Sequence, residues 1–503
     1  MAADKDVRRE MLISHDVNET RVAIVENKEL VELYVERARH SVVGNIYLGK
    51  VTDVLPGMQA AFVDIGLEKN AYLYVDDVRT RDGDGRAESI GGAVNVGQKI
   101  MVQVTRDAMG TKGARVSMAL SIPGRFLVLT PCNPRRAVSK KIEGERRVHL
   151  LELMARELPE ELGAIARTAC ADADEADIIG DLGFLTRVWR RVEKQSREVV
   201  APDILYAEVD LAMRCVRDMF SAAFDSLTIE GKPVYDKVAA FIRRSAPALQ
   251  KRVHIYKDKT TPLLETGNLK EQIGQSFKRE APLPSGGFLV IDKTEALITI
   301  DVNTGSYVGR RNLEETLLKT NLEAAHEAVR QLRLRDLGGI IIIDFIDMEL
   351  DSSKERLMAR LAAELERDHT RTKLVGLDSL GLVEITRKNT GDGLFETMTE
   401  ICPWCAGTGR RMTGTTRKIA VEREIRSYVH ASRARSFLFA LNDETYAYCT
   451  GPGVNLAAVI KAETGKEVRF IADNTLDALE VACVLEGEKP STPLLTPRLF
   501  SKK

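Results

Sequence analysis

The sequence predicts a multidomain protein in which α/β domains are combined with a small β-barrel. Residues 285–348 have the pattern of a strand, a crossover helix and a second strand, because two short β-branched runs, 297–300 and 340–343, flank a charged amphipathic stretch. Residues 41–123 instead contain short alternating runs separated by glycines, which is typical of a closed barrel. At about 150 residues per domain, the chain has room for three or four domains.

The first predicted element is a β-hairpin. Residues 20–26 and 30–36 alternate apolar and polar side chains on either side of a short polar turn. Two strands alone do not form a domain, so we expect the hairpin to pair with a later segment, and the strand-like run 253–256 is the candidate. Residues 1–40 and 214–279 are therefore predicted to form one domain that is interrupted by an insertion.

The insertion is predicted to begin with an OB-type barrel at residues 41–123. Phe62 and Tyr72 lie on its predicted strands. The cations of the same segment are Lys50, Lys99, Arg106, Lys112 and Arg115. Exposed aromatic rings beside cations are the means by which such barrels hold single-stranded nucleic acid. The alternative is that both rings belong to the barrel core, and the sequence alone supports the two interpretations equally.

Residues 124–213 are predicted to form a mixed α/β domain with helices at 144–157 and 174–199. Within it, Arg167 and Thr168 follow an apolar, strand-like run. A guanidinium beside a hydroxyl suits the binding of a terminal phosphate. A lone Arg-Thr pair is more often an ordinary surface strand end, so both interpretations stay open.

Two carboxylates mark the predicted carboxyl ends of strands within residues 280–399. Asp301 follows the first apolar run and Asp344 the second. Strands joined by a crossover helix are parallel, so both aspartates are expected at one sheet edge, where open α/β sheets bind ligands. With Asn303 nearby, two hard oxygen ligands suit Mg²⁺. The alternative is that each aspartate only ends a strand or a turn.

One pair of cysteines has the spacing of half a zinc site, Cys402-Pro-Trp-Cys405. Gly407 and Gly409 follow it and leave room for backbone amides near the sulfurs. No second Cys-x-x-Cys exists in the sequence. A second chain related by a two-fold axis is then the simplest source of the other two thiolates, which predicts a zinc-linked homodimer. A redox dithiol, or a site completed by His430 and another residue, is the alternative.

The two ends of the chain are expected to differ from its middle. Residues 1–10 are charged and are expected to form a frayed tail. Residues 400–411, which carry the cysteine pair, are predicted to link to a small α/β domain at 412–503. The proline-rich end of that domain is expected to be disordered.

The composition excludes some classes of protein. Lys plus Arg number 73 and Asp plus Glu 74, so net charge gives no sign of nucleic-acid binding and any basic surface must be local. The sequence has neither a membrane-spanning apolar run nor a secretion signal, so a cytoplasmic location is expected. The seven cysteines are thinly spread apart from one close pair and are expected to be reduced thiols.

Six stretches of the sequence carry a resemblance to a known family. They are GNIYLGKVTDVLPGMQAAFVDIG, GTKGAR, LPSGGFLVIDKTEALITIDVNTG, RQLRLRDLGGIIIIDFIDM, GLVEITRK and CPWCAGTG. Over about residues 11–411 the chain closely resembles the bacterial ribonuclease E/G family. The resemblance implies an RNase H-like domain interrupted by an OB-type RNA-binding barrel and a 5′-sensor domain. A DNase I-like catalytic domain, a zinc link and a small dimerisation domain are implied to follow.

For the catalytic domain, the resemblance implies a Mg²⁺-dependent endoribonuclease. Asp301 and Asp344 match the metal ligands of the family, and Asn303 matches a residue that orients the catalytic centre. The expected reaction is hydrolysis of single-stranded RNA to 5′-phosphate and 3′-hydroxyl ends, in rRNA and tRNA processing and in mRNA decay. The alternatives from other classes are a non-catalytic RNA-binding scaffold protein and a phosphodiesterase that acts on DNA.

The resemblance also implies surfaces that bind RNA. Phe62, Tyr72 and Lys112 match RNA-binding positions of the barrel, with Tyr72 in place of the phenylalanine of some relatives. The residues that match a pocket for a 5′-monophosphate are Gly124, Val128, Arg167 and Thr168, with Arg371 contributing from the catalytic domain. The acidic segment 171–177, where the family often has a glycine-bearing loop, leaves the strength of 5′-end sensing open. Whether the zinc-linked homodimers pair into tetramers stays open too.

Overall fold

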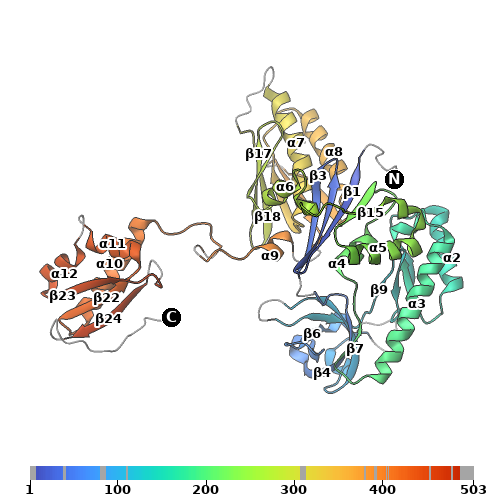
Figure 1. The fold of residues 1–503 in the computed structure, drawn as a ribbon, viewed down its shortest axis with the longest axis horizontal. Coiled ribbons are helices and arrows are strands. Elements are labelled where there is room, and N and C mark those ends of the chain that lie inside the picture. The colour runs from blue at the N-terminus through green and yellow to red at the C-terminus, as the bar shows by residue number, and fades with distance from the viewer. Residues whose placement is uncertain are drawn as a thin grey trace. The chain divides into compact units, whose positions relative to one another are not determined.

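The structure, a computed structural model, describes residues 7–37, 41–79, 87–108, 112–305, 313–378, 381–389, 393–403, 405, 407–451, 455–476 and 480–487. The chain divides into two compact units, Met1–Thr399 and Glu400–Lys503, and each is described by itself (Figure 1). The proline-rich end, 488–503, lies outside the described residues. Within the ranges given above, no helix is both long and apolar enough to cross a membrane.

Segments from before and after the insertion form one five-stranded sheet. Its strands, in spatial order, are β15 (Val253–Ile255), β14 (Ser226–Ile229), β1 (Arg9–His15), β2 (Glu19–Glu26) and β3 (Glu29–Arg37). The run 253–256 therefore joins the sheet of the opening hairpin, but through β14 and β1 rather than directly. The expectation of a frayed tail is wrong for Arg9 and Glu10, which begin β1.

Three helices accompany this first sheet. They are α4 (Leu211–Asp218), α5 (Lys232–Ser245) and α6 (Leu269–Gln275). Met11 and Ile13 of β1 alternate with more exposed neighbours and are fully buried, as are Leu227 and Ile229 of β14. These side chains share a core with the apolar faces of α4 and α5, so packing decides the strand register.

A closed barrel of five strands confirms the prediction for the next segment. The strands are β4 (Ile46–Leu55), β5 (Ala60–Asp64), β6 (Ala71–Tyr74), β8 (Arg115–Ser117) and β7 (Lys99–Arg106), with β7 pairing back onto β4. A short helix, α1 (Ile90–Ala93), lies between β6 and β7 in the sequence. The later strand β13 (Asp203–Tyr206) also pairs with β4. Closure removes the free strand edges that an open sheet of this size would leave.

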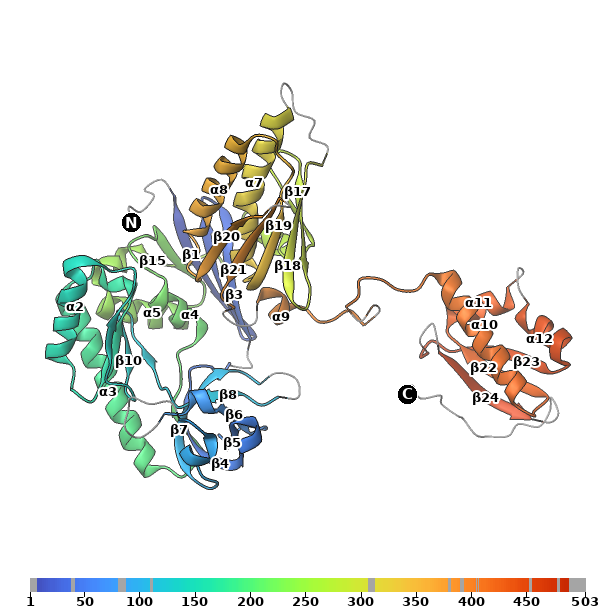
Figure 2. The ribbon, with the colours of Figure 1, turned by 180° about the vertical axis from the view of Figure 1, so that it is seen from behind.

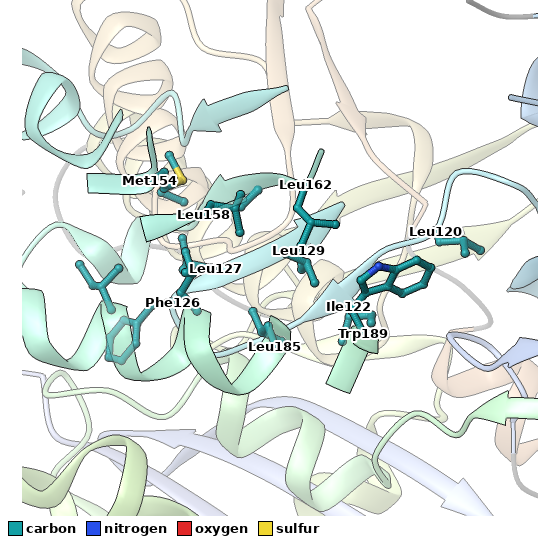
Figure 3. Close-up of a cluster of buried hydrophobic side chains, with 14 of the residues drawn as sticks. Leu120, Ile122, Phe126, Leu127, Leu129, Met154, Leu158, Leu162, Leu185 and Trp189 are labelled. Carbon is teal, nitrogen blue, oxygen red and sulfur yellow. The ribbon is translucent and has the colours of Figure 1, made fainter. Parts of the chain in front are cut away.

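A four-stranded sheet with two long helices forms the next part of the chain. Its strands, in spatial order, are β11 (Arg136–Val138), β12 (Gly163–Ala166), β10 (Leu127–Thr130) and β9 (Ile122–Pro123). Helices α2 (Gly144–Glu157) and α3 (Glu175–Glu198) confirm the two helices predicted here. Figure 3 shows their buried side chains, such as Met154, Leu185 and Trp189, gathered against Leu127 and Leu129 of β10.

A six-stranded sheet, here called the carboxylate sheet, contains the two predicted parallel strands. In spatial order it is β16 (Glu280–Pro282), β17 (Phe288–Lys293), β18 (Leu297–Asn303), β19 (Gly339–Asp344), β21 (Leu382–Arg387) and β20 (Thr372–Leu377). Only β18 and β19 are parallel to each other. Helices α7 (Leu313–Leu334) and α8 (Asp351–Leu365) cover one of its faces (Figure 2).

Buried charges anchor helix α7 to the first sheet. Arg333 Nη2 lies 3.0 Å from Glu26 Oε1 and 2.8 Å from Glu32 Oε1, and all three side chains are buried. Arg330 Nη1 donates to the backbone oxygen of Leu30 at 2.8 Å. Buried charges are costly unless they are paired, so these contacts fix the position of α7 against β2 and β3. The short helix α9 (Leu394–Met398) ends this unit.

The second unit is a small α/β domain. Its strands β23 (Glu467–Ala472), β22 (Ser436–Leu441) and β24 (Val481–Gly487) form one sheet in that order. Its helices are α10 (Gly414–Ala431), α11 (Asp443–Thr450) and α12 (Leu456–Thr464). Phe437 and Phe439 of the central strand are buried and stack with ring centroids 6.0 Å apart. This agrees with the α/β pattern predicted after residue 412.

His326 links the first sheet to helix α8 through two carboxylates. Its Nε2 lies 3.4 Å from Glu29 and its Nδ1 lies 3.2 Å from Glu364. The contacts with Glu29 and Glu364 raise the pKa of His326 to about 9. Glu364 also pairs with Arg360 and Arg367, so its charge stays compensated when His326 loses its proton.

His326→Gln is expected to lower the free energy of unfolding by on the order of 1 kcal/mol in mild acid, after allowance for the partial exposure of the ring. A histidine with a raised folded-state pKa stabilises fully below its unfolded-state pKa of about 6.5. That contribution disappears as the pH rises through about 9. Denaturant unfolding of protein and variant should therefore converge at alkaline pH. A constant difference, or the same trend in the exposed control His254→Gln, contradicts this assignment.

Candidate active site and RNA-binding surfaces

The register of β18 and β19 brings the two predicted carboxylates together. Asp301 and Asp344 are Cα partners at the carboxyl ends of the two parallel strands. Both side chains are exposed, whereas the preceding Ile300 and Ile343 are buried under the helices. Asn303 donates from Nδ2 to Asp301 Oδ2 at 2.9 Å. The three residues thus form one polar group on the open face of the carboxylate sheet, at the carboxyl ends of β18 and β19.

The electrostatics of this group favour a cation. Partial burial and the negative charges of Asp301 and Asp347 raise the pKa of Asp344 above its ordinary value. A bound cation would relieve that repulsion. Among the described residues, no three or more His, Cys, Asp or Glu side chains are grouped to hold a metal. Two carboxylates and an amide fit Mg²⁺, which commonly takes one or two protein carboxylates and keeps several waters.

Two glycines allow the segments around Asn303 to approach each other closely. A Cβ on Gly287 would lie 2.5 Å from the backbone oxygen of Asn303. A Cβ on Gly305, which has φ +59°, would lie 2.4 Å from the backbone oxygen of Gly286. No side chain fits at these distances, so the backbone that carries Asn303 is held against β17 only because glycine occupies both positions.

The barrel presents its two predicted aromatic residues side by side. Phe62 of β5 and Tyr72 of β6 are cross-strand partners, with ring centroids 6.1 Å apart in an edge-on arrangement. Their strand neighbours, such as Val63 and Leu73, are fully buried, whereas the two rings are half-buried. Alternation along the strands therefore points both rings outward, and neither ring belongs to the barrel core.

The cationic side chains of the barrel differ in whether they are paired with a carboxylate. Arg115 is paired with Asp77 at 2.7 Å. Lys112 is exposed and lies two residues before Ala114, whose backbone oxygen accepts a hydrogen bond from Tyr72 at 2.7 Å. Lys112 therefore lies on the strand segment next to Tyr72, which is where a cation can meet the phosphate of a stacked nucleotide.

Two of the predicted phosphate-binding residues, Gly124 and Thr168, lie next to Arg167. Arg167 Nη1 donates to the backbone oxygen of Gly124 at 2.9 Å, and Thr168 Oγ1 lies 2.9 Å from Ser139 Oγ. Val128 is half-buried on β10, where it pairs with Ile165 of β12. Arg371 is exposed just before β20 of the carboxylate sheet, and no described hydrogen bond or ion pair joins it to the others.

Two acidic residues that the sequence analysis did not single out organise this pocket. Asp218 Oδ1 lies 2.5 Å from Arg167 Nη1, although the two residues are 51 positions apart. Asp181 of α3 accepts hydrogen bonds from the backbone nitrogens of Phe126 and Leu127, at 2.8 and 3.0 Å. A Cβ on Gly124 would lie only 2.4 Å from Asp181 Oδ2. No local spacing signals either contact, because each joins segments far apart in the chain.

The two cysteines of the pair differ in their surroundings. Backbone N–H groups of Gly409 and Gly407 lower the pKa of the Cys405 thiol. Both glycines have positive φ, +68° and +83°, which lets their amides turn toward the sulfur. Cys402 is exposed. In the described part of this unit neither His430 nor any other residue completes a group of three metal ligands.

Gly287→Ala is expected to destabilise the protein by roughly 1–3 kcal/mol, because the added methyl meets the backbone oxygen of Asn303 in a packed region. The matched control is Gly274→Ala on α6, where a Cβ meets nothing within 4 Å. That change is expected to stabilise by up to about 1 kcal/mol, through helix propensity alone. Urea unfolding of both variants measures the difference. Equal effects of the two substitutions would contradict the close approach described here.

Comparison with known proteins identifies the family. The model of the ribonuclease E/G family matches residues 121–390. Ribonuclease G of Escherichia coli (strain K12) is 37% identical over 470 residues, which cover 92% of this chain and 96% of that protein. Ribonuclease E of Haemophilus influenzae is 35% identical over 413 residues, which cover 80% of this chain and 44% of that protein. The chain therefore belongs to the ribonuclease E/G family.

Proposed function

We propose that this protein is an endoribonuclease that cleaves single-stranded RNA at the Asp301–Asp344 site with the help of Mg²⁺. The observation that carries the proposal is the juxtaposition of these two aspartates in the pairing of β18 with β19, in a chain of this family. The proposal also assigns an RNase H-like fold to the first sheet and a DNase I-like fold to the carboxylate sheet. Its cellular role would be rRNA and tRNA processing and mRNA decay.

In this mechanism, Asp301 and Asp344 would hold a Mg²⁺ ion, and the Asn303 amide, which donates to Asp301, would fix the orientation of that carboxylate. When bound, Mg²⁺ supplies a Lewis acid for the scissile phosphate and a water of lowered pKa. Attack by water on phosphorus leaves a 5′-phosphate and a 3′-hydroxyl. The 2′-hydroxyl takes no part in such a cut, so the preference for RNA must come from the surfaces that bind the chain.

The barrel supplies one such surface. The outward rings of Phe62 and Tyr72 offer faces on which bases can stack, and stacking on an aromatic side chain contributes about 1–3 kcal/mol per base. Lys112 is exposed just before β8, the strand that pairs with the Tyr72 strand, and could pair with a phosphate. Stacking tolerates any base but requires an unpaired strand, so the barrel would favour single-stranded RNA.

The Arg167 pocket supplies a second surface, for the 5′ end of the RNA. Arg167 and Thr168 offer charged and hydroxyl donors, Gly124 accepts a hydrogen bond from Arg167, and Val128 lies on the neighbouring strand β10. Such donors suit the doubly charged terminal group of a 5′-monophosphate. Arg371 would contribute once RNA is bound. A preference for 5′-monophosphorylated substrates follows from this proposal.

The cysteine pair would join two chains. Cys402 and Cys405 provide two thiolates, and a structural zinc site needs four ligands. A second copy of this chain supplies the missing two by symmetry. The proposed assembly is therefore a homodimer with one shared Zn²⁺.

Asp301→Asn is expected to slow the cleavage of a single-stranded RNA by on the order of 100-fold or more, since a group that stabilises developing charge is lost. The matched control is Asp292→Asn, a carboxylate of the same sheet that lies on β17 opposite Thr299 and pairs with Arg279. Cleavage rates with Mg²⁺ and with EDTA, on RNA and on a DNA oligonucleotide of the same sequence, provide the measurement. Mg²⁺-dependent cleavage that survives Asp301→Asn would rule out this site.

Arg167→Ala is expected to remove most of the preference for a 5′-monophosphate over a 5′-triphosphate. A charge-assisted hydrogen bond contributes about 1.5–3 kcal/mol, which corresponds to roughly 10- to 100-fold in kcat/KM. The measurement is the ratio of kcat/KM for two RNAs that differ only in carrying a 5′-monophosphate or a 5′-triphosphate. The control is Arg191→Ala, on the exposed face of α3. An unchanged ratio would show that Arg167 does not read the 5′ end.

Cys405→Ser is expected to release zinc and to convert the dimer to monomers. Native mass spectrometry should find one zinc for two chains in the parent protein and none in the variant. Cys132→Ser, at a half-buried cysteine of the first unit, is the control. Two zinc ions per dimer, or a zinc-free dimer, would argue against a shared site.

A further inference from the structure

Asn321 is a fully buried amide on the helix that covers the carboxylate sheet. It lies in the apolar stripe of α7, three residues after Leu318 and three and four before Ala324 and Ala325, all of which are buried. An amide in such a place is costly unless it is hydrogen-bonded. A leucine or methionine would fill the same position without that cost, so the contacts of this amide require an explanation.

Both hydrogen bonds of Asn321 go to one residue. Its Nδ2 donates to the backbone oxygen of Ile346 at 2.7 Å, and its Oδ1 accepts from the backbone nitrogen of Ile346 at 3.1 Å. The side chain therefore pairs with Ile346 as a neighbouring strand would. Ile346 follows Asp344 by two residues, just after β19 ends and its backbone pairing stops.

The same helix holds the rest of this segment. Glu314, seven residues before Asn321 and so on the same side of α7, accepts from the backbone nitrogens of Glu349 and Leu350, at 3.3 and 3.2 Å. Phe345, just before Ile346, and Met348, between Ile346 and Glu349, are buried in the core of the carboxylate sheet. The segment between β19 and α8 is thus fixed to α7 at both ends.

We propose that Asn321 is a positioning residue of the active site, which holds the Asp344 carboxylate in register with Asp301 by clamping Ile346. This inference rests on the proposed function. Mg²⁺ demands near-ideal octahedral geometry, so a small displacement of one carboxylate weakens the site. Strand pairing fixes Asp344 from the β18 side, and the Asn321 clamp fixes the chain that leaves it.

The test compares Asn321→Ala with Thr320→Val in the full-length protein. Thr320 is equally buried and donates only within α7, to the backbone oxygen of Thr316. Asn321→Ala is expected to raise the Mg²⁺ concentration for half-maximal cleavage about tenfold, as is typical when a partner of a metal ligand is removed. The KM for RNA should not change, and Thr320→Val should behave as the parent protein does. Calorimetry with Mn²⁺ should show the same loss of affinity.

A purely structural role would lower the unfolding temperature without moving the metal dependence of the folded protein. Parental Mg²⁺ and Mn²⁺ responses in folded Asn321→Ala would therefore overturn the proposal. If that variant does not fold, Asn321→Ser, which can keep one of the two bonds, decides by the same measurements. A parent protein that binds Mn²⁺ but does not cleave RNA would refute the proposed function. In that case, the Mn²⁺ affinities of the parent protein and of Asn321→Ala would still test whether Asn321 positions the carboxylates.

Discussion

The in-register pairing of two parallel strands is the constraint on which the rest of the site depends. Asp301 and Asp344 meet because β18 and β19 run in the same direction and end together. Alternation then places both carboxylates on the face opposite the buried Ile300 and Ile343. A shift of one residue in the pairing register of either strand would bury its carboxylate and expose its isoleucine. The apolar side chains under the helices thus hold two carboxylates together, and partial burial followed by the charge of Asp301 raises the pKa of Asp344.

Helix α7 transmits this constraint to the surrounding structure. Its buried Arg333 pairs with two glutamates of the first sheet, and its buried Asn321 holds the chain after Asp344. Neither polar side chain improves the apolar packing of the helix. Each forms its ion pairs or hydrogen bonds with residues far away in the sequence. We interpret α7 as the element that fixes the carboxylate pair relative to the first sheet, so that the proposed RNA-binding surfaces outside the carboxylate sheet could serve one proposed cleavage site.

Much of this architecture could be predicted from the sequence, because its signals are local. The β-branched runs that become β18 and β19, the amphipathic stretch of α7 and the glycine-punctuated strands of the barrel each lie within a short window. The juxtaposition of Asp301 and Asp344 could be predicted for the same reason, since each follows an apolar run directly, whereas the role of Asn303 was inferred from the resemblance. The tail prediction failed at Arg9 because β1 begins with charged residues and acquires its pairing from β2 and β14.

Other features had no local signal. The contacts of Arg167 with Asp218 and of Asn321 with Ile346 join residues that only the fold brings together. The outward direction of Phe62 and Tyr72 depends on which face of each strand the barrel closes over, and the short alternating runs fit either face. Arg371 was assigned to 5′-phosphate binding by resemblance alone, as a contribution from the catalytic domain, and it lies just before β20 of the carboxylate sheet.

The central claim is that Asp301 and Asp344 together bind one divalent cation. Anomalous scattering from crystals soaked in Mn²⁺, which substitutes for Mg²⁺ at oxygen ligands, tests that claim most directly. We expect one strong peak within bonding distance of a carboxylate oxygen of each aspartate, and its loss in crystals of a variant that lacks either carboxylate. A peak on only one aspartate, or a strong peak elsewhere with none between these two strand ends, would contradict the account.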